Sequence, residues 1–389
     1  MNEALYNQTA DKFKQHYGTD HTATAYAPGR VEVLGNHTDY NEGLVLSAAI
    51  NMGIFCLAAP SPDNTCRIVA GDLMQEASFE LTDLTPDPDN MWANYIKGVF
   101  VKLREREQSK ITTAFNLLFF SNVPLGAGLS SSAALEISSG LCFSSLYDVS
   151  VPKLDMALIG QASEHEYAGV MCGVMDQISS IFGKENHLIK SDFRTLEVEN
   201  APLGKELCFI VCDTNAKHAL ADGVYNKRRL KCEEAAKYFA TVLDHPVTAL
   251  RDVTMAEWEK HQADMDPLAA KRSAHVIGEN ERVALGAQYL KQGNAEAFGE
   301  LMFASHKSSI ENFENSCEEL DFIVEHAHKI PGALGARLSG GGFGGSAVIL
   351  VHPRDIETVS QAIKAPYEKQ FDLTCSIRTI IPSAGASIL

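Results

Sequence analysis

The chain has 389 residues, more than one hydrophobic core usually serves, so its length predicts two domains. Hydrophobic residues make up 45% and charged residues 21% of the chain, as in ordinary globular proteins. The net charge of -17 argues against nucleic acid or an anionic membrane as the main partner, because both bind through basic patches. A small anion such as a phosphate chain remains compatible, since it needs only backbone N–H groups and one or two cations.

Three features of the sequence indicate the cellular compartment of the protein. Nine cysteines without CxxC pairs or Cys/His metal spacing predict reduced thiols and a cytoplasmic protein. Residues 1–18 are typical of an amphipathic helix and contain no apolar signal core. No run of about 18 apolar residues occurs, so we expect no membrane span.

Short apolar runs alternate with longer helical periods, which predicts a mixed α and β protein. We expect strands at Ala23–Ala27, Gly53–Ala59, Thr113–Phe120, Leu207–Cys212 and Ser346–Val351. We expect helices at Ser130–Tyr147, Lys153–Tyr167, Gly223–Leu243, Met255–Gln262, Ser273–Lys291 and Ala295–Asn312. The turn-like segment "ENAPLGKE" near residues 200–206 separates two apolar segments and suggests a domain boundary there.

The first polar segment, "APGRVEVLGNHTDYNEG", occupies residues 27–43. It places an arginine, a histidine and an aspartate within ten residues, between glycines at 29, 35 and 43. Such a segment is either a solvated surface loop or a binding loop that grips a ligand rich in hydroxyl groups.

The second polar segment, "SNVPLGAGLSSSAALEIS", occupies residues 121–138. The preceding strand is expected to end at Phe120, and three serines then open a helix. The first turn of a helix leaves backbone N–H groups unpaired and carries partial positive charge, so this segment is suited to a phosphate chain. The alternative is a capped core helix. The segment lacks the Gly-Lys-[Ser/Thr] ending of a Walker A loop and the third glycine of a dinucleotide fingerprint.

The third segment, "GARLSGGGFGGSAVIL", occupies residues 335–350 and has five glycines in six positions. Such a run excludes a regular helix or strand at that point, and the apolar residues after it have strand composition. We predict a loop that lies against a ligand or another loop. The alternative is a flexible glycine hairpin.

Together the three segments resemble the galactokinase family of the GHMP small-molecule kinases. The first resembles the galactose-binding signature, "PLGAGLSSSAA" the GHMP phosphate loop, and "LSGGGFGG" the third GHMP motif. Residues 164–198, 225–236 and 305–327 also match in register, so the resemblance spans nearly the whole chain. It implies an α+β fold of two domains, a ribosomal-protein S5 domain 2-like domain over 1–205 and a ferredoxin-like domain over 206–389, with the final residues packing back on the first.

The resemblance also implies an activity and its cofactors. It implies ATP-dependent phosphorylation, with Mg²⁺, of the anomeric hydroxyl of α-D-galactose to galactose 1-phosphate. The partners implied are the sugar and ATP, with no nucleic acid and no membrane. We expect a monomer.

Two residues match the catalytic positions of the family. Asp176, in "CGVMDQ", matches the catalytic aspartate, which either accepts the proton of the anomeric hydroxyl or orients that hydroxyl. Arg30 would lie beside Asp176 and the γ-phosphate, where a guanidinium stabilises the transferring phosphoryl group. The alternatives are a helix N-cap for Asp176 and a surface cation for Arg30.

Further residues match binding positions. The sugar positions are Asn36, His37, Asp39, Gly173 and Tyr225; Asp39 can accept from two vicinal hydroxyls and His37 can donate to another. The nucleotide positions are Gly126, Gly128, Leu129, Ser130, Ser131, Ser132 and Ala133. Ser132 and Glu164 match the Mg²⁺ positions, and on a helix Glu166 would point elsewhere. Trp92 and Tyr95 either flank the base or belong to the core.

The chain departs from the family signature, Gly-Arg-x-Asn-x-Ile-Gly-Glu-His-x-Asp-Tyr, at three positions. Glu32 stands for the asparagine, Leu34 for the isoleucine and Asn36 for the acid. The family's acid lies near C6 of the sugar and accepts from its hydroxyl. Asn36 is neutral and can both donate and accept, which raises the hypothesis that galacturonic acid is phosphorylated instead of, or beside, galactose.

Two other functions are weighed. A sugar sensor without catalysis is disfavoured by the intact "LSSSAA" together with Arg30 and Asp176. A different GHMP kinase, such as a mevalonate or homoserine kinase, is disfavoured by the "HTDY" sugar loop.

Overall fold

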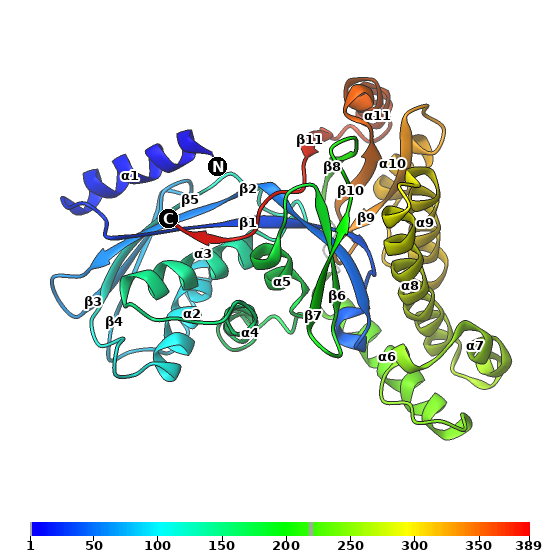
Figure 1. The fold of residues 1–389 in the computed structure, drawn as a ribbon, viewed down its shortest axis with the longest axis horizontal. Helices are drawn as coiled ribbons and strands as arrows, with labels where there is room; N and C mark the ends of the chain where they lie inside the picture. The colour runs from blue at the N-terminus through cyan, green and yellow to red at the C-terminus, as the bar shows by residue number, and fades with distance from the viewer. Residues whose placement is uncertain (1, 218–220) are drawn as a thin grey trace.

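The structure is a computed structural model that describes residues 2–217 and 221–389; the side chains of residues 217 and 221–225 lie outside the description. The elements form two sheets with helices on their faces (Figure 1), which confirms the mixed α and β class. None of the helices in the described ranges has the length and apolar character of a membrane span. All nine cysteines are free thiols, as their spacing predicts.

The larger sheet has eight strands in the order β12-β1-β2-β5-β3-β4, with β6 paired to β2 and β7 to β6. Its bounds are β1 (Ala23–Leu34), β2 (Leu44–Pro60), β3 (Thr65–Ala70), β4 (Gln75–Glu80), β5 (Phe115–Ser121), β6 (His187–Asp192), β7 (Glu197–Pro202) and β12 (Ser387–Ile388). The pairing of β3 with β5 is parallel, and the other pairings are antiparallel. The last strand lies on β1, with Ile388 opposite Ala25.

Helices cover both faces of this sheet. One face carries α2 (Met91–Arg106), α3 (Ser131–Leu146), α4 (Lys153–Ser163) and α5 (Met175–Phe182), and the opposite face carries α1 (Glu3–Tyr17) (Figure 1). The amphipathic pattern predicted for the N-terminal segment is confirmed, because Leu5 and Phe13 are buried against Phe55 and Phe120 of the sheet.

The smaller sheet has the order β11-β8-β10-β9 and is antiparallel throughout. Its bounds are β8 (Cys208–Lys217), β9 (Ala333–Ser339), β10 (Gly344–Val351) and β11 (Ser376–Ile380). Alternate residues of β8 face two different cores, as the two-residue period of a strand requires. Phe209 and Val211 join the core of the larger sheet, whereas Ile210 packs with α10 and α11.

The helices of the second half are α6 (Ala221–Val242), α7 (Met255–His261), α8 (Pro267–Lys291), α9 (Ala295–Ser308), α10 (Glu318–Ala327) and α11 (Ile356–Phe371). Short 3₁₀ turns are η1 (Asp39–Asn41), η3 (Leu250–Asp252), η4 (Gln262–Asp264) and η6 (Pro353–Asp355). Two π-helical turns, η2 (Glu164–Ala168) and η5 (Ser309–Phe313), directly follow α4 and α9.

The structure corrects several predicted elements. The strand expected at Ala23–Ala27 continues to Leu34, so Arg30 lies in a strand and not in a loop. The helices expected to reach Tyr167 and Asn312 are α-helical only to Ser163 and Ser308, and each ends in a π turn. The chain between β7 and β8 is the place where we propose the boundary between 1–205 and 206–389.

Candidate active site

A cleft of about 460 Å³ lies where the two sheets meet, between β1, the loop after it, α5 and the tip of the β9–β10 hairpin. Of the site residues predicted from the sequence, the cleft is lined by Arg30, Asn36, His37, Asp39, Gly173 and Asp176. Segments that are far apart in the chain therefore converge on one space, as the resemblance implies. The polar first segment is not a solvated surface loop, because most of residues 30–38 are buried.

Arg30 and Asp176 form a bidentate ion pair at one end of the cleft. Nε of Arg30 lies 2.7 Å from Oδ1 and Nη2 lies 2.9 Å from Oδ2 of Asp176. Nη1 of Arg30 donates to the carbonyl of Gly128 at 2.6 Å, so one guanidinium joins the carboxylate to the glycine loop. The Arg30 side chain is 6% exposed and that of Asp176 is 25% exposed, which excludes a surface cation. Asp176 lies in the first turn of α5, after the N-cap Val174.

The glycine-serine segment takes a conformation that leaves a helix start unpaired. Gly126, Gly128 and Ser130 all have positive φ, which glycine adopts easily and serine rarely. Ser130 precedes α3 but makes no side-chain cap; its hydroxyl donates to Oδ2 of Asp176 instead. The capped-helix alternative is therefore wrong, and the first N–H groups of α3 remain available to an anion.

The other residues at the predicted nucleotide positions differ in their burial and in their hydrogen bonds. Leu129 and Ala133 are buried, and the carbonyl of Leu129 accepts from the N–H of Arg30 at 3.0 Å, so these two residues hold the segment in place. Ser131 begins α3 and Ser132 follows it. Trp92 and Tyr95 are partly buried and pack against the core of the larger sheet.

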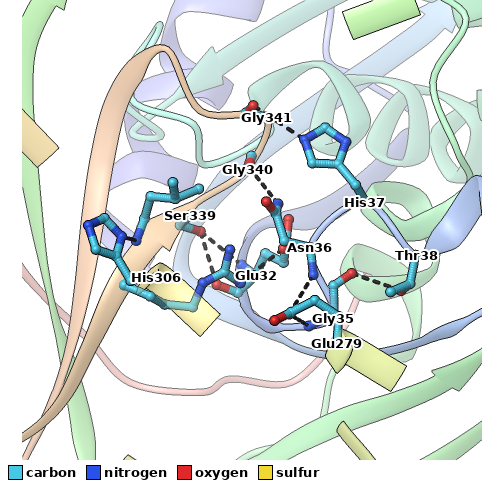
Figure 2. A network of polar contacts seen from close by, with 12 residues as sticks. Glu32, Gly35, Asn36, His37, Thr38, Glu279, His306, Ser339, Gly340 and Gly341 are labelled. Carbon is cyan, nitrogen blue, oxygen red and sulfur yellow. Dashed lines mark hydrogen bonds and ion pairs between the residues drawn. The ribbon is translucent and has the colours of Figure 1, made fainter. Parts of the chain in front are cut away.

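His37 is held as a neutral ring at the side of the cleft. Its ring stacks on Phe313 with centroids 4.3 Å apart, and Nδ1 lies 2.9 Å from the Tyr40 hydroxyl. Burial, with the neighbouring His275, holds the pKa of His37 well below its usual value. Nε2 of His37 lies 3.4 Å from the carbonyl of Gly341 (Figure 2), so a neutral His37 can donate to a ligand hydroxyl only in place of this contact.

Asp39 begins η1 and lines the same cleft. Burial and the charge of Glu32 raise the pKa of Asp39 to about 7. Gly173 lies against this carboxylate, because a Cβ added there would come within 1.7 Å of Oδ2 of Asp39. Glycine at 173 therefore allows Asp39 to take its position.

The loop that carries these residues is fixed by a buried carboxylate from α8. The N–H groups of Gly35 and Asn36 donate to Oε2 of Glu279 at 2.7 Å and 3.0 Å (Figure 2). Burial alone would raise the pKa of Glu279, but the charge of Arg282, whose Nε lies 2.6 Å from Oε1, holds it well below the usual range. The loop thus rests on an ionised group.

Asn36 lines the cleft, but its amide is already occupied (Figure 2). Nδ2 donates to Oε1 of Glu32 at 2.9 Å and to the carbonyl of Gly340 at 2.8 Å, and Oδ1 accepts from Nδ2 of Asn315 at 2.9 Å. Both amide hydrogens are used, and the residue is 1% exposed. This geometry argues against Asn36 as a direct sugar ligand. It also shows that the glycine hairpin tip lies against the sugar loop.

Glu164 is a carboxylate beside the start of α3. Its Oε2 accepts from Sγ of Cys172 at 3.1 Å and from Nε2 of Gln177 at 2.9 Å, and burial raises its pKa. The Ser132 hydroxyl lies near this carboxylate and partly offsets the rise of its pKa. Glu166 points elsewhere, as predicted, and pairs with Lys102 at 2.5 Å.

This oxygen pair fits a Mg²⁺ ion. Among the described residues, no group of three His, Cys, Asp or Glu could hold a metal ion by itself. Mg²⁺ commonly takes only one or two protein oxygens and completes its shell with phosphates and water. A hydroxyl and a carboxylate near a phosphate loop meet that requirement.

One predicted sugar contact falls on a side chain outside the described residues, and several residues that line the cleft were not predicted from the sequence. The side chain of Tyr225 lies outside the described residues, so its predicted contact stays a prediction. The cleft is also lined by Glu32, Asn226, residues 169–172 and the backbone of Gly340 and Gly341. Asn226 follows Tyr225 in a segment that matches the family, and that match was the available signal.

Comparisons with known proteins agree with this geometry. Three family profiles match: the galactokinase galactose-binding signature over residues 11–60, the GHMP kinases N terminal domain over 94–184 and the GHMP kinases C terminal domain over 287–369. The galactokinase of Haemophilus influenzae is 40% identical over 94% of both chains, and that of Pasteurella multocida is 38% identical over 97% of both.

Solved structures give the same result. The galactokinase of Lactococcus lactis, solved with galactose, superposes with a TM-score of 0.93 at 31% identity, over 99% of this chain and 100% of that one. A mevalonate kinase superposes with a TM-score of 0.64 at 17% identity, over 93% of this chain and 99% of that one, which shows a shared fold. The chain therefore belongs to the galactokinases, within the GHMP kinase superfamily.

Proposed function

We propose that the protein transfers the γ-phosphoryl group of ATP to the anomeric hydroxyl of α-D-galactose, giving galactose 1-phosphate and ADP. The observation that carries this proposal is the Arg30–Asp176 pair, which joins the sugar cleft to the glycine-serine loop through the bond from Arg30 to Gly128. A group that is transferred between ATP and a sugar must cross this junction.

Asp176 and Arg30 have distinct roles in the proposed reaction. The Asp176 carboxylate faces the anomeric hydroxyl and either accepts its proton or orients it as the oxygen attacks phosphorus. The Arg30 guanidinium stabilises the charge that spreads over the phosphoryl oxygens. The hydroxyl of Ser130, which donates to Asp176, holds the carboxylate toward the phosphate loop.

The remaining residues bind and orient the two substrates. Asp39 accepts from vicinal ring hydroxyls and His37 donates to another, while the N–H groups at the start of α3 bind the phosphates. When bound, Mg²⁺ would be held by Ser132 and Glu164 and would neutralise charge on the β- and γ-phosphates. Tyr225 is proposed as a further sugar contact or packing wall.

We also propose that the protein acts in the cytoplasm as a monomer. Free thiols at all nine cysteines support the compartment. The galacturonate hypothesis loses its basis, because the amide of Asn36 is committed to Glu32, Gly340 and Asn315.

The test is to incubate the protein with galactose, MgCl₂ and ATP labelled at the γ-phosphate, and to identify the product by ³¹P NMR. The expected product is α-galactose 1-phosphate, formed with one ADP per sugar. Galactose binding without labelled product would identify a sensor. Equal turnover of galacturonate would restore the broader specificity.

A further inference from the structure

Gln177 joins two buried carboxylates beside the proposed metal site. It follows Asp176 in the first turn of α5 and is fully buried. Its Nε2 donates to Oε2 of Glu164 at 2.9 Å and to Oε2 of Glu136 at 2.8 Å. Glu136 lies in α3 and is also fully buried. The proposed reaction uses Glu164 for Mg²⁺ and assigns no role to Gln177 or Glu136.

This bridge connects the start of α3 with the turn that carries Glu164. Helices α3, α4 and α5 pack against one another, and η2 directly follows α4. Ser132 and Glu136 are four residues apart in α3, so they share one face of this helix. The Ser132 hydroxyl lies near the Glu164 carboxylate, and Glu136 holds the same carboxylate through the amide of Gln177. The position of Glu164 is thus set from one face of the helix that begins at the phosphate loop.

Helix α4 leaves room for the bridge at Gly160. A Cβ added to Gly160 would lie 3.0 Å from Cγ of Gln177 and 3.1 Å from Oε2 of Glu136, and both distances are shorter than ordinary van der Waals contacts. Glycine in the interior of a helix weakens the helix relative to alanine. A glycine at this buried position is explained by the space that the two polar side chains occupy.

The bridge is costly if it serves only the core. Among the described residues, Oε1 of Gln177 and Oε1 of Glu136 are buried and have no hydrogen-bond partner. Buried polar atoms without partners destabilise a fold, and apolar side chains of the same shape would avoid that cost. A partly satisfied polar cluster next to a functional carboxylate is better explained by the orientation that it gives this carboxylate.

The geometry at Glu164 shows which orientation is held. The thiol of Cys172 and the amide of Gln177 both donate to Oε2 of Glu164, at 3.1 Å and 2.9 Å. This leaves the second oxygen, Oε1, for a metal ion. Carboxylates that bind metals are commonly held by such hydrogen bonds from groups that do not touch the metal. A thiol is a weak donor, so the amide of Gln177 is the stronger of the two contacts.

We propose that Gln177 is a positioning residue that holds Glu164 in the orientation for binding Mg²⁺. The inference rests on the proposed function. Because Gln177 directly follows Asp176, one turn of α5 carries both the carboxylate proposed to face the anomeric hydroxyl and the amide that orients the metal-binding carboxylate. Side chains of consecutive helix residues point in directions about 100° apart, which allows the two residues to serve different neighbours.

The test disrupts the bridge in three ways. Gln177→Met keeps the length of the side chain but has no donor, and Gln177→Asn keeps the amide but withdraws it by one methylene. Gly160→Ala adds a methyl group that pushes on the bridge while favouring helix α4. Gln292→Met, at an exposed position, is the matched control.

Two readouts are titrated with MgCl₂ for each protein. One is the rise in melting temperature caused by saturating AMP-PNP, a non-hydrolysable ATP analogue, and it needs no turnover. The other is the initial rate with galactose and ATP, which gives kcat and the KM for galactose. Each readout yields the Mg²⁺ concentration for half-maximal effect.

In both Gln177 variants, the half-maximal Mg²⁺ concentration should rise about 10- to 100-fold in both readouts, as is usual when a residue that orients a metal ligand is lost. Gly160→Ala should raise it about threefold or more, and the control should match the unsubstituted protein. At saturating Mg²⁺, kcat should return to within about fivefold of the unsubstituted protein, and the KM for galactose should stay within about threefold. A substitution that merely loosens the fold would lower the melting temperature without moving the Mg²⁺ requirement.

The outcomes separate the two proposals. If the unsubstituted protein does not phosphorylate galactose, the proposed function is wrong, and the melting-temperature readout still tests Gln177. If it is active, but the half-maximal Mg²⁺ concentration in folded Gln177 variants stays within about threefold of its own, only the role of Gln177 is wrong. Should neither Gln177 variant fold, Gly160→Ala decides, and an unchanged Mg²⁺ requirement in that protein overturns the role.

Discussion

Replacing Arg30 with lysine keeps a positive charge in the cleft but removes the planar fork that holds three groups at once. In the structure the guanidinium donates to both oxygens of Asp176 and to the carbonyl of Gly128. The lysine side chain is shorter, and its ammonium group can replace one of these three hydrogen bonds. We therefore count two hydrogen bonds as lost. Hydrogen bonds to charged groups contribute about 1.5–3 kcal/mol each. Because Asp176 is one quarter exposed, we take the lower part of that range.

Two such bonds give a loss of about 3–4 kcal/mol in transition-state stabilisation, which corresponds to roughly a 10²- to 10³-fold lower kcat. The KM for galactose should change less, because the sugar's ring hydroxyls contact other residues. The assay is ADP release with galactose as acceptor, alongside calorimetric titration with galactose. Arg354→Lys, at a side chain that is 78% exposed, is the control and should keep parental turnover. A folded Arg30→Lys protein with kcat within tenfold of the parent would refute the reasoning.

Four further predictions concern the rest of the site. Because the pKa of Asp39 is raised to about 7, the free enzyme loses this carboxylate as the pH falls, and kcat/KM for galactose should drop about tenfold per pH unit below 7; a flat profile from pH 8 to 5.5 would contradict this. Because the pKa of Asp39 is raised from 3.8 to about 7 in the fold, stability is lost progressively as the pH rises between these two values, and the loss is complete above pH 7. Asp39→Asn should therefore raise the melting temperature at pH 8 and not at pH 4; an equal shift at both pH values would contradict the assignment. Gly173→Ala forces Asp39 aside and should raise the KM for galactose about 10-fold or more, whereas an unchanged KM would show that Asp39 does not need its present position. Glu164→Gln should raise the Mg²⁺ concentration needed for half-maximal rate about 10-fold or more; an unchanged requirement would remove Glu164 from the metal site.

The helices and strands that were predicted from the sequence are those marked by a pattern within their own residues. The N-terminal helix and α3 were found because apolar period and turn residues marked them. The edge strand β4 alternates exposed and half-buried residues and carries little apolar signal. Helix α5 is only eight residues long, and α11 contains Pro366, which normally argues against a helix interior. The burial of α11 against the smaller sheet outweighs the cost of Pro366 inside this helix.

The candidate site likewise contains residues that were predicted from the sequence and residues that were not. Arg30, His37 and Asp39 were noticed because they are polar residues crowded between glycines, whereas Asp176 was assigned only from the resemblance to the family. The buried ion pair of Glu32 with Arg337 was not predicted, because the two residues lie 305 positions apart in the chain. Without that contact, Glu32 and Asn36 looked like two separate departures from a signature, whereas in the structure they are hydrogen-bonded neighbours.

The central claim is that Asp176 acts on the hydroxyl that receives the phosphoryl group. The most direct measurement compares the rate of label transfer from γ-labelled ATP to galactose in the parent and in Asp176→Ala, with galactose affinity measured on the same samples. The account predicts a loss of about 10³-fold or more in turnover, while sugar binding survives in part. Turnover within tenfold of the parent would contradict it.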